Sequence, residues 1–539
     1  MPADPRDGLE ARAESHAPER AEAAHRRDAD LGGPALLGER TILGERRILL
    51  VAIRTRAGDE LRCGLVGVDG DVRRGDLAGA EGCEQEGQWS APVRCRPYAS
   101  PVRAVSAAGA ARCILSFPSM ARIVIGCWGS HGDFDPSVGL GLGLQRRGHD
   151  VTVATIAYFE PHLRAAGLKF HAIRPDVRPD DASLIQRIMD RDHGTEVLLR
   201  EIVYPALPAM LEDFTPLVGT TDLFVSHPLT MVIPMLAEKH GIPWASTVLA
   251  PMSFFSPTDI PVLPPAPWLK ALDGLGRWPG RVLAAAADVA TRGWAAPAYA
   301  LRESMRLPRG GNPLFDAQHS PHLVLALYSK VLGAPQPSWP ANVVITGHMF
   351  HDATHGATLA PEVEDFLARG PPPVVFTLGS SAILAPGTFW RESLAAVRAL
   401  GVRAICMVGP GNAEALRAEL PSHAMALEMA PHSLLMPRAS VVVQQCGIGT
   451  LAQGLRSGAP MLAVPFAHDQ PDNAYRATKL GLARILPPSR YRAPRVAEEL
   501  ERLVRDPSYR AAAQRVASEV RAERGVDVAC DALEARFGL

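Results

Sequence analysis

The sequence predicts an α/β protein in which two βαβ-containing domains follow one another along the chain. Two glycine turns support this prediction, because each lies between a run of strand-forming residues and a helix-like run. The first turn spans 129–136 and follows the apolar run 121–128, and the second spans 447–450 and follows three valines at 441–443. The length of 539 residues is enough for two or more domains.

The composition is that of an ordinary globular protein and excludes several classes. Hydrophobic residues make up 47% and charged residues 21%, and the net charge of -1 argues against a nucleic-acid-binding protein that relies on bulk positive charge. No apolar run approaches the roughly 18 residues of a membrane span. No charged-then-apolar signal peptide opens the chain. The eight cysteines form no CxxC pair, so we expect neither a disulfide framework nor a zinc site, and a cytoplasmic location.

Residues 1–119 differ from the rest of the chain. The first 33 residues are charged, rich in alanine and arginine and almost free of large apolar side chains, which predicts a disordered extension. Strand-like runs at 47–53 and 63–68 allow a small β element, although no convincing core follows them. Met120 is the first methionine after Met1 and is an alternative start, so we expect no functional domain before it.

The first glycine turn carries ionisable side chains at the carboxyl end of its strand, where open α/β sheets bind ligands. Asp133 either lies at a cleft or caps the helix expected at 137–147. Asp135 is the better cap candidate, because Pro136 directly after it suits the first helical position. A dinucleotide site is disfavoured, since the GxGxxG spacing is missing and no acidic residue closes the strand 150–155. Close packing is the expected reason for the glycines at 139, 141 and 143.

The second glycine turn belongs to a unit that reads as strand, turn, helix, strand and polar loop over 441–474. A glycine turn at a helix N-terminus presents free backbone N–H groups and the positive end of the helix dipole, which suits a phosphate. Asp469 and Gln470 follow the second strand, and a carboxylate beside an amide suits sugar hydroxyls. An ordinary βαβ unit with a surface loop explains the pattern equally well.

This second unit resembles the nucleotide-sugar signature of the inverting glycosyltransferases of the GT-B fold, which have two Rossmann-like domains facing across a cleft. The residues in register are Gly447, Gly449, Thr450, Gly458, Pro460, Pro465, Asp469, Gln470, Asn473 and Ala474. The turn 129–136 and Arg147-Gly148-His149 resemble the family's first βα unit. Within family 1, the chain is most similar to the bacterial branch that includes the rhamnosyltransferase B subunit of rhamnolipid synthesis and the macrolide and sterol glucosyltransferases.

The resemblance implies an acceptor-binding domain at 120–347, a linker at 348–372, a nucleotide-sugar-binding domain at 373–539 and a final helix that crosses back onto the first domain. It implies hexosyl transfer from a UDP- or dTDP-sugar to a hydroxyl of an apolar small molecule or lipid, with inversion and without a metal. The donor is then a co-substrate, no cofactor is expected, and no nucleic acid is a partner; peripheral membrane contact stays open. The irregular apolar stretch 251–267 suits an acceptor pocket or simple loop packing.

Donor contacts are implied for a set of residues in the second domain, namely Gly379, Ser380, Ser381, Pro431, Gln444, Gln445, Gly447, Gly449, Thr450, Gln453, Asp469 and Gln470. Three glutamines depart from the family pattern. Gln444 and Gln445 stand where relatives have histidine, and Gln453 replaces a glutamate, while Met429 replaces the usual aromatic residue of the base-binding loop. The glutamines favour an alternative function as a catalytically weak nucleotide-binding auxiliary protein. A sugar-nucleotide epimerase of the same fold is a third possibility.

The catalytic base implied by the resemblance is Asp133, because inverting transfer needs a base on the domain that faces the donor. His131 is the fallback base. Asp133 with Asp135 and Asp190 with Asp192 form Asp-x-Asp patterns that bind metal in another glycosyltransferase fold. Such three-residue patterns occur often by chance, so no metal site is expected.

Overall fold

The computed structural model describes residues 40–43, 46–54, 61–67, 120–178, 181–351 and 358–539. The chain divides into two compact units, Met1–Gly109 and Ala110–Leu539. In the first unit, antiparallel strands β1 (Arg40–Leu43), β2 (Arg46–Arg54) and β3 (Leu61–Gly67) form a sheet in that order. The small β element that the sequence allowed is thus present. The predicted disorder of 1–39 and 68–119 lies outside the described residues.

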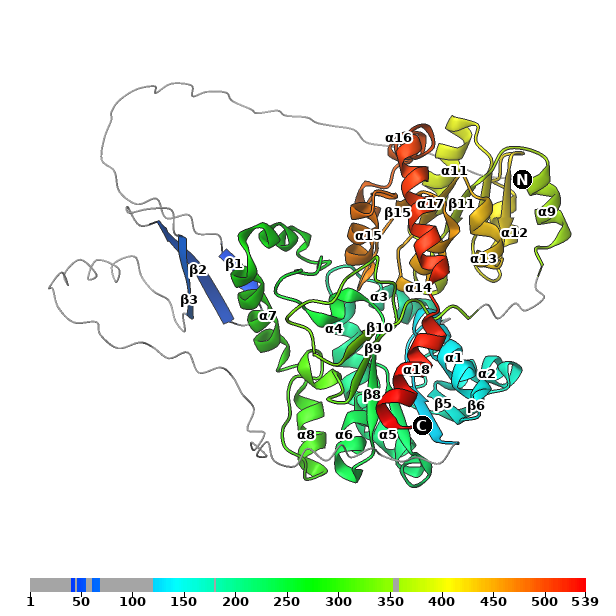
Figure 1. Ribbon diagram of the computed structural model, residues 1–539. Coiled ribbons are helices and arrows are strands. Elements are labelled where there is room, and N and C mark those ends of the chain that lie inside the picture. Colours follow the sequence, from blue (N-terminus) through cyan, green and yellow to red (C-terminus); the bar gives the residue numbers. More distant parts are fainter. Residues whose placement is uncertain (1–39, 44–45, 55–60, 68–119, 179–180, 352–357) are drawn as a thin grey trace, which may run out of the picture. The chain divides into compact units, whose positions relative to one another are not determined.

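The first domain of the second unit is a sheet of seven parallel strands, which Figure 1 shows in its lower half. Its strand order is β10-β9-β8-β7-β4-β5-β6. The strands are short and mostly buried, as expected when helices cover both faces of a parallel sheet. Their bounds are β4 Arg122–Gly126, β5 Asp150–Thr155, β6 Lys169–Ala172, β7 Leu223–Ser226, β8 Trp244–Val248, β9 Leu323–Ala326 and β10 Val343–Ile345.

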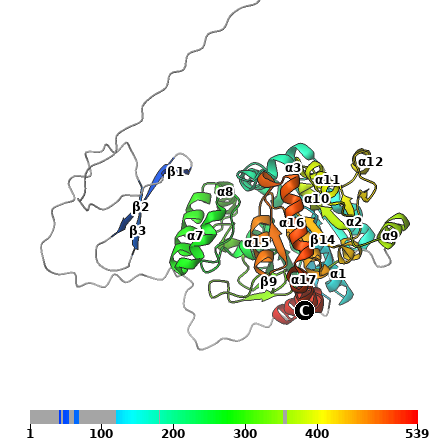
Figure 2. The same ribbon diagram turned by 90° about the horizontal axis from the view of Figure 1, so that it is seen from above.

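The helices of the first domain lie between these strands along the chain. Figure 2 shows α7 and α8 on one side of the domain and α1 and α2 on the other. The bounds are α1 His131–Arg146, α2 Glu160–Ala166, α3 Ala182–Ile188, α4 Gly194–Val197, α5 Tyr204–Phe214, α6 Val232–His240, α7 Arg277–Thr291 and α8 Ala296–Ser304. The stretch expected to be irregular begins with one 3₁₀ helix, η4 (Pro251–Phe254), and ends where a second, η5 (Pro267–Leu275), begins.

The second domain is a sheet of six parallel strands in the order β13-β12-β11-β14-β15-β16. The strands are β11 Val374–Thr377, β12 Ala404–Met407, β13 Ala424–Leu427, β14 Val441–Gln444, β15 Met461–Ala463 and β16 Ala483–Ile485. The helices are α10 Gly379–Ala382, α11 Phe389–Leu400, α12 Ala413–Arg417, α13 His432–Leu435, α14 Ile448–Ser457, α15 Gln470–Lys479 and α16 Ala493–Arg505. The predicted pair of Rossmann-like domains is therefore present.

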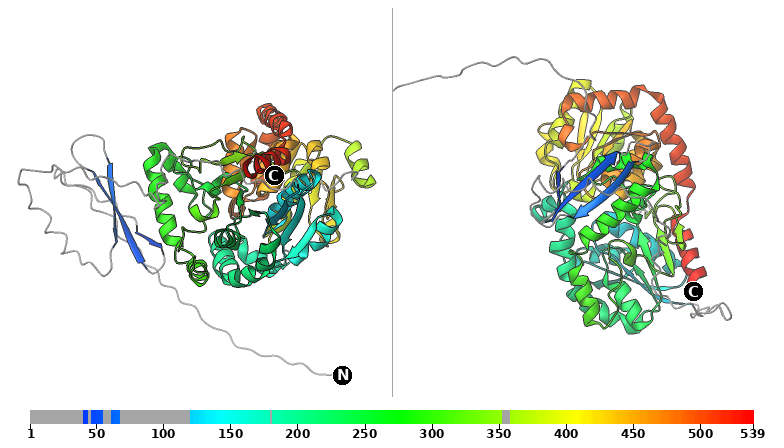
Figure 3. Two further views of the ribbon diagram at one scale, coloured as in Figure 1. Left: turned by 60° about the horizontal axis from the view of Figure 1, so that its bottom comes forward. Right: turned by 90° about the vertical axis from the view of Figure 1, so that its left-hand side faces the viewer.

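The last two helices connect the domains, as the resemblance implied. Helix α17 (Pro507–Ala522) packs against α14, and α18 (Gly525–Phe537) packs against α1 (Figures 1 and 3). The close approach explains a glycine inside α1, since a Cβ on Gly143 would lie 2.4 Å from Val526 Cγ1. Arg147 pairs with Asp531 and Glu534, each with 2.6 Å between nitrogen and oxygen.

The segment predicted as a linker is partly helical. Helix α9 (Pro361–Ala368) buries Val363 and Leu367 in the core of the second domain. The sequence reading missed this helix because the surrounding glycines and prolines suggest a loop. No helix within the described ranges is both long enough and apolar enough to cross a bilayer.

Candidate active site

The N-terminus of α1 is built around the carboxylate of Asp133. Ser130 is the N-cap, and Asp133 Oδ2 accepts hydrogen bonds from the Ser130 backbone N–H (2.8 Å) and from Ser130 Oγ (3.2 Å). This capping box differs from the prediction that Asp135 caps a helix beginning at Pro136. The helix begins five residues earlier, at His131, and Pro136 lies inside it. Asp133 therefore takes part in capping the helix, which is the alternative role considered for it.

The glycine before this helix is required by the position of the same carboxylate. Gly129 has φ of +141°, and a Cβ there would lie 2.3 Å from Asp133 Oδ2. Both the backbone conformation and the space exclude a larger residue. The turn thus holds Asp133 against the end of β4, at the carboxyl edge of the sheet.

The second oxygen of Asp133 faces a buried histidine. His227 follows β7, the neighbour of β4, and its Nε2 lies 3.3 Å from Asp133 Oδ1. His227 Nδ1 accepts the backbone N–H of Leu229 at 3.2 Å, which assigns the proton of a neutral ring to Nε2. The sequence analysis did not single out His227. Its position at the end of the adjacent strand was the signal that could have paired it with Asp133.

His131, the fallback base, points into a different environment. Its ring packs edge-on against Phe159, with 5.0 Å between ring centroids, and against His162 at 5.7 Å. Its Nδ1 lies 3.7 Å from Asp135 Oδ1. Residues two apart on a helix project in different directions, so His131 and Asp133 do not form one site.

The N-terminus of α14 meets the N-terminus of α1 across the two domains. A Cβ on Gly449 would lie 3.5 Å from Gly132 Cα, so the two backbones are almost in contact. Gly447 is the N-cap of α14, and the first intrahelical bond comes from Leu451 N–H. Within the described chain, nothing accepts a hydrogen bond from the N–H groups of 448–450. These groups remain available for an anion.

The two predicted donor glutamines at the end of β14 have different environments. Gln444 is fully buried and its Nε2 lies 2.8 Å from Met461 Sδ, a contact that does not support its assignment to the donor, which stays a prediction. Gln445 instead lies beside the N-terminus of α14, where its Nε2 donates to Thr450 Oγ1 at 3.2 Å. Successive side chains of a strand point to opposite faces, so only one of the two reaches the edge.

Gln445 brings together several residues predicted to bind the donor. A Cβ on Gly379, which has φ of +63°, would lie 2.2 Å from Gln445 Nε2, so the loop after β11 passes directly over the amide. Gln445 Oε1 is buried and has no hydrogen-bond partner in the described ranges. Ser380 and Ser381 follow in the single turn of α10. The side-chain amide of Gln445 is thus surrounded by Gly379, Gly447 and Thr450.

The predicted sugar-binding pair lies at the start of α15. Burial raises the pKa of the Asp469 carboxyl to about 7, and the negative charge of Asp133 adds to this rise, although the hydrogen bond from Asn473 opposes it. Asn473 Nδ2 donates to Asp469 Oδ2 at 2.6 Å. Gln470 Oε1 accepts the backbone N–H of Phe466 at 2.8 Å, so this oxygen holds the loop before the helix.

The other residues singled out from the sequence lie elsewhere in the two domains. Gln453 is half-buried on α14, and its Oε1 has no partner in the described part of the chain. Pro431 and Met429 line a cavity of about 410 Å³ at the end of β13. Met429 is 75% exposed, so a flat ligand could cover it. Asp190 Oδ1 accepts the N–H groups of Asp192 and His193 and so stabilises a turn.

Comparisons with known proteins place the chain in a family. The family model of the C-terminal domain of proteins like the erythromycin biosynthesis protein CIII matches residues 391–533. An O-mycaminosyltylonolide 6-deoxyallosyltransferase from Streptomyces fradiae is 32% identical over 430 residues, which cover 77% of this chain and 97% of that protein. The chain is a family 1 glycosyltransferase of the GT-B fold. The predicted family and enzyme class are confirmed.

Other proteins similar to this glycosyltransferase act in different settings. A sterol 3-beta-glucosyltransferase from Arabidopsis thaliana is 27% identical over 379 residues, covering 66% of this chain and 58% of that protein. The structure of a spinosyn forosaminyltransferase has a TM-score of 0.57 at 17% identity, covering 78% of this chain and 100% of the other. The glycosyltransferase VinC in complex with dTDP has a TM-score of 0.54 at 19% identity, with 77% and 99% covered. These structures share the fold.

Proposed function

We propose that this glycosyltransferase transfers a hexosyl group from a nucleoside diphosphate sugar to a hydroxyl of an apolar acceptor, with inversion and without a metal ion. The observation that carries the proposal is the meeting of the α1 and α14 N-termini, which belong to different domains. Asp133 on one side is near enough to Asp469 on the other for its charge to contribute to the raised pKa of Asp469. A base and a donor-binding helix end therefore share one site.

The diphosphate of the donor would bind at the N-terminus of α14. The free N–H groups of 448–450 and the helix dipole supply positive potential there. Thr450 Oγ1 already accepts from Gln445, so its hydroxyl proton is free to donate to a phosphate oxygen. This helix end would offset the charge of the leaving diphosphate, which supports transfer without a metal.

The sugar and the base of the donor would lie on either side of the diphosphate. The carboxylate of Asp469 suits the sugar hydroxyls, and the NH₂ group of Gln470 is left to donate because its oxygen is engaged. The cavity of about 410 Å³ beside Met429 would hold the base. The shared fold with VinC, solved with dTDP, supports a nucleotide site in this domain.

The reaction would proceed by a single displacement. Asp133 Oδ1 accepts the proton of the acceptor hydroxyl while the oxygen forms a bond to the anomeric carbon and the bond to the diphosphate breaks. His227 Nε2–H, 3.3 Å from Oδ1, fixes the orientation of that carboxylate. The substrates named for the macrolide and sterol relatives support an apolar hydroxylated acceptor. The irregular apolar segment after β8 would line its binding site.

The experiment that tests this function follows nucleoside diphosphate release from a panel of UDP- and dTDP-sugars, with and without macrolide aglycones and sterols. Release that requires both substrates, with unchanged rate in EDTA, supports the proposal. Release without an acceptor would indicate hydrolysis, and isomerisation of the sugar without release would indicate an epimerase. Binding of a donor without release or isomerisation would favour the catalytically weak nucleotide-binding auxiliary protein.

The amide of Gln445 gives a prediction with an internal control. Gln445→Leu should raise the donor KM by roughly tenfold, because a polar group beside the diphosphate site is lost. Gln445→His should preserve or improve donor use. Gln444→Met is the control, since Gln444 is buried against Met461, and it should leave the donor KM unchanged. Steady-state kinetics with varied donor measures all three, and equal effects of Gln444→Met and Gln445→Leu would contradict the assignment.

A further inference from the structure

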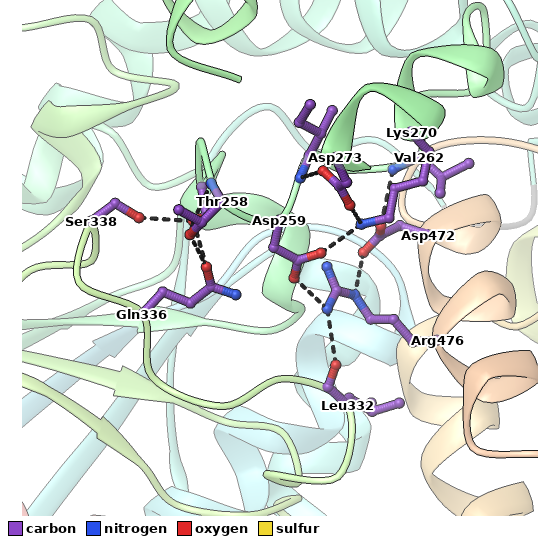
Figure 4. A network of polar contacts seen from close by, with 12 residues as sticks. Thr258, Asp259, Val262, Lys270, Asp273, Leu332, Gln336, Ser338, Asp472 and Arg476 are labelled. Carbon is purple, nitrogen blue, oxygen red and sulfur yellow. Dashed lines mark hydrogen bonds and ion pairs between the residues drawn. The ribbon is translucent and has the colours of Figure 1, made fainter. Parts of the chain in front are cut away.

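A buried ion network joins the two domains beside the candidate active site (Figure 4). Its centre is Arg476 on α15, whose Nε donates to Asp472 Oδ2 at 2.6 Å. The same guanidinium reaches the first domain, where its Nη1 lies 2.7 Å from Asp259 Oδ2 and 3.0 Å from the carbonyl oxygen of Leu332. Asp472 Oδ1 accepts the backbone N–H of Val262 at 3.0 Å. Asp472 and Arg476, one turn apart on α15, thus make four polar contacts, and three of these cross between the domains.

The network continues through the segment that follows β8. Lys270 Nζ lies 2.6 Å from Asp259 Oδ1 and 2.8 Å from Asp273 Oδ2. Asp273 Oδ1 accepts the backbone N–H of Ile260 at 2.9 Å. Lys270 also lies over the ring of Tyr475 on α15, 5.1 Å from its centroid. The segment 258–273 is therefore held at several points by charged side chains rather than by regular backbone pairing.

Burial makes these ion pairs sensitive to the loss of one partner. Asp472 is fully buried, and Arg476 and Lys270 are 8% and 9% exposed. Burial works against the charge of Asp259, but Arg476 and Lys270 outweigh it and lower the pKa of Asp259. A buried charge without its partner is strongly destabilising, so the segment and the helix cannot separate without cost.

Both connected elements carry substrate-facing parts of the proposed function. Helix α15 begins directly after Asp469 and includes Asn473, which donates to Asp469. The segment 258–273 overlaps the irregular stretch 251–267, which is proposed to line the acceptor site. We propose that Asp259, Asp472 and Arg476 are positioning residues that make this acceptor-side segment and the donor-sugar end of α15 move as one body. The effect of this connection on substrate binding rests on the proposed function, whereas the connection itself does not.

The mechanical connection is testable without any substrate by hydrogen exchange of the full chain. Asp259→Asn removes the charge that crosses the domains but leaves the Arg476–Asp472 pair and the Lys270–Asp273 pair in place. Amide exchange should accelerate by roughly tenfold or more both in 258–273 and in 470–479, although only the first segment carries the substitution. Acceleration confined to 258–273 would overturn the proposal.

Two further variants separate this effect from general destabilisation. Asp222→Asn removes an ion pair with Arg122 at the amino edge of the first sheet, and Asp222 is 18% exposed at its side chain against 20% for Asp259. This control should change exchange near β4 and β7 and leave 470–479 unchanged. Arg476→Lys keeps the charge but lacks the planar fork that binds Asp472, Asp259 and Leu332 together. It should accelerate exchange in both segments, which keeps the test open if Asp259→Asn does not fold.

The substrate-linked part uses UDP and dTDP as probes. In the unaltered enzyme, the nucleotide that binds should slow exchange in 258–273 as well as in the second domain, and in Asp259→Asn it should protect the second domain only. Equal protection of 258–273 in both proteins would contradict the coupling. If neither nucleotide binds, the proposed function fails, while the exchange rates of the free proteins still decide whether the two segments move together.

Discussion

Replacing Asp133 with asparagine should lower turnover by roughly 100-fold or more while nucleoside diphosphate binding persists. The amide keeps the shape of the side chain and can still accept the backbone N–H of Ser130, so α1 keeps its cap. It cannot accept the proton of an acceptor hydroxyl. Single-turnover kinetics with saturating donor, together with calorimetric titration of the diphosphate, measure both quantities.

Two variants separate the base from the cap. Ser130→Ala removes the N-cap side chain and should lower stability by about 1 kcal/mol with a small effect on turnover. Asp135→Asn alters the neighbouring carboxylate, which faces His131 rather than His227, and should leave turnover near normal. Near-normal turnover of Asp133→Asn would refute its role as base and make His131 the next residue to test. Unfolding of Asp133→Asn would identify capping as its main role.

The donor KM should rise by about tenfold for each pH unit below 7, because the Asp469 carboxyl must be ionised to accept hydrogen bonds from the sugar. Burial raises its pKa to about 7, so protonation begins near neutral pH in the free enzyme. The inhibition constant of the nucleoside diphosphate alone should stay flat over the same range, since it lacks the sugar. Asp469→Ala should weaken transfer more than it weakens diphosphate binding, and so should Gln470→Ala.

The charge interaction between Asp133 and Asp469 predicts the direction in which the pH dependence shifts when Asp133 is replaced. Asp133→Asn removes a negative charge near Asp469, so the pKa of Asp469 should fall and the rise of the donor KM should move to lower pH.

The Asp469 carboxyl also affects the stability of the fold. Its folded pKa of about 7 lies above the unfolded value of about 3.9, so the folded state binds the extra proton and stability declines as pH rises through this window. Asp469→Asn should flatten that decline in thermal unfolding curves, and an unchanged pH dependence would contradict the raised pKa.

The sequence predicts the parts of this site that depend on local patterns. The glycine turns after β4 and β14 are recognisable because a strand, a glycine and a helix follow one another, and parallel sheets bring such turns to one edge. The glycines within α1 were attributed to close packing, and Gly143 meets α18 in that way. The crossing of the last helix onto the first domain came from the resemblance.

Features that depend on side-chain direction or on distant contacts were not predictable. Gln444 and Gln445 are adjacent in sequence, and only the alternating direction of their side chains decides which one contacts Thr450 at the N-terminus of α14. Ser130 was overlooked as the cap because Pro136 suggested a later helix start. The pairing of Asp259 with Arg476 joins residues far apart in the chain, and Asp259 lies in an irregular segment. Helical periodicity alone does not specify such a pair.

The anomeric configuration of the product is the most direct test of a single displacement with Asp133 as the base. In the proposed mechanism, a base at Asp133 acts from the first domain, on the face of the sugar opposite a diphosphate held by α14, so the acceptor attacks once and from behind. Proton NMR of the first product formed should therefore show the anomeric configuration opposite to that of the donor. Retention of the donor configuration would contradict a single displacement with Asp133 as base.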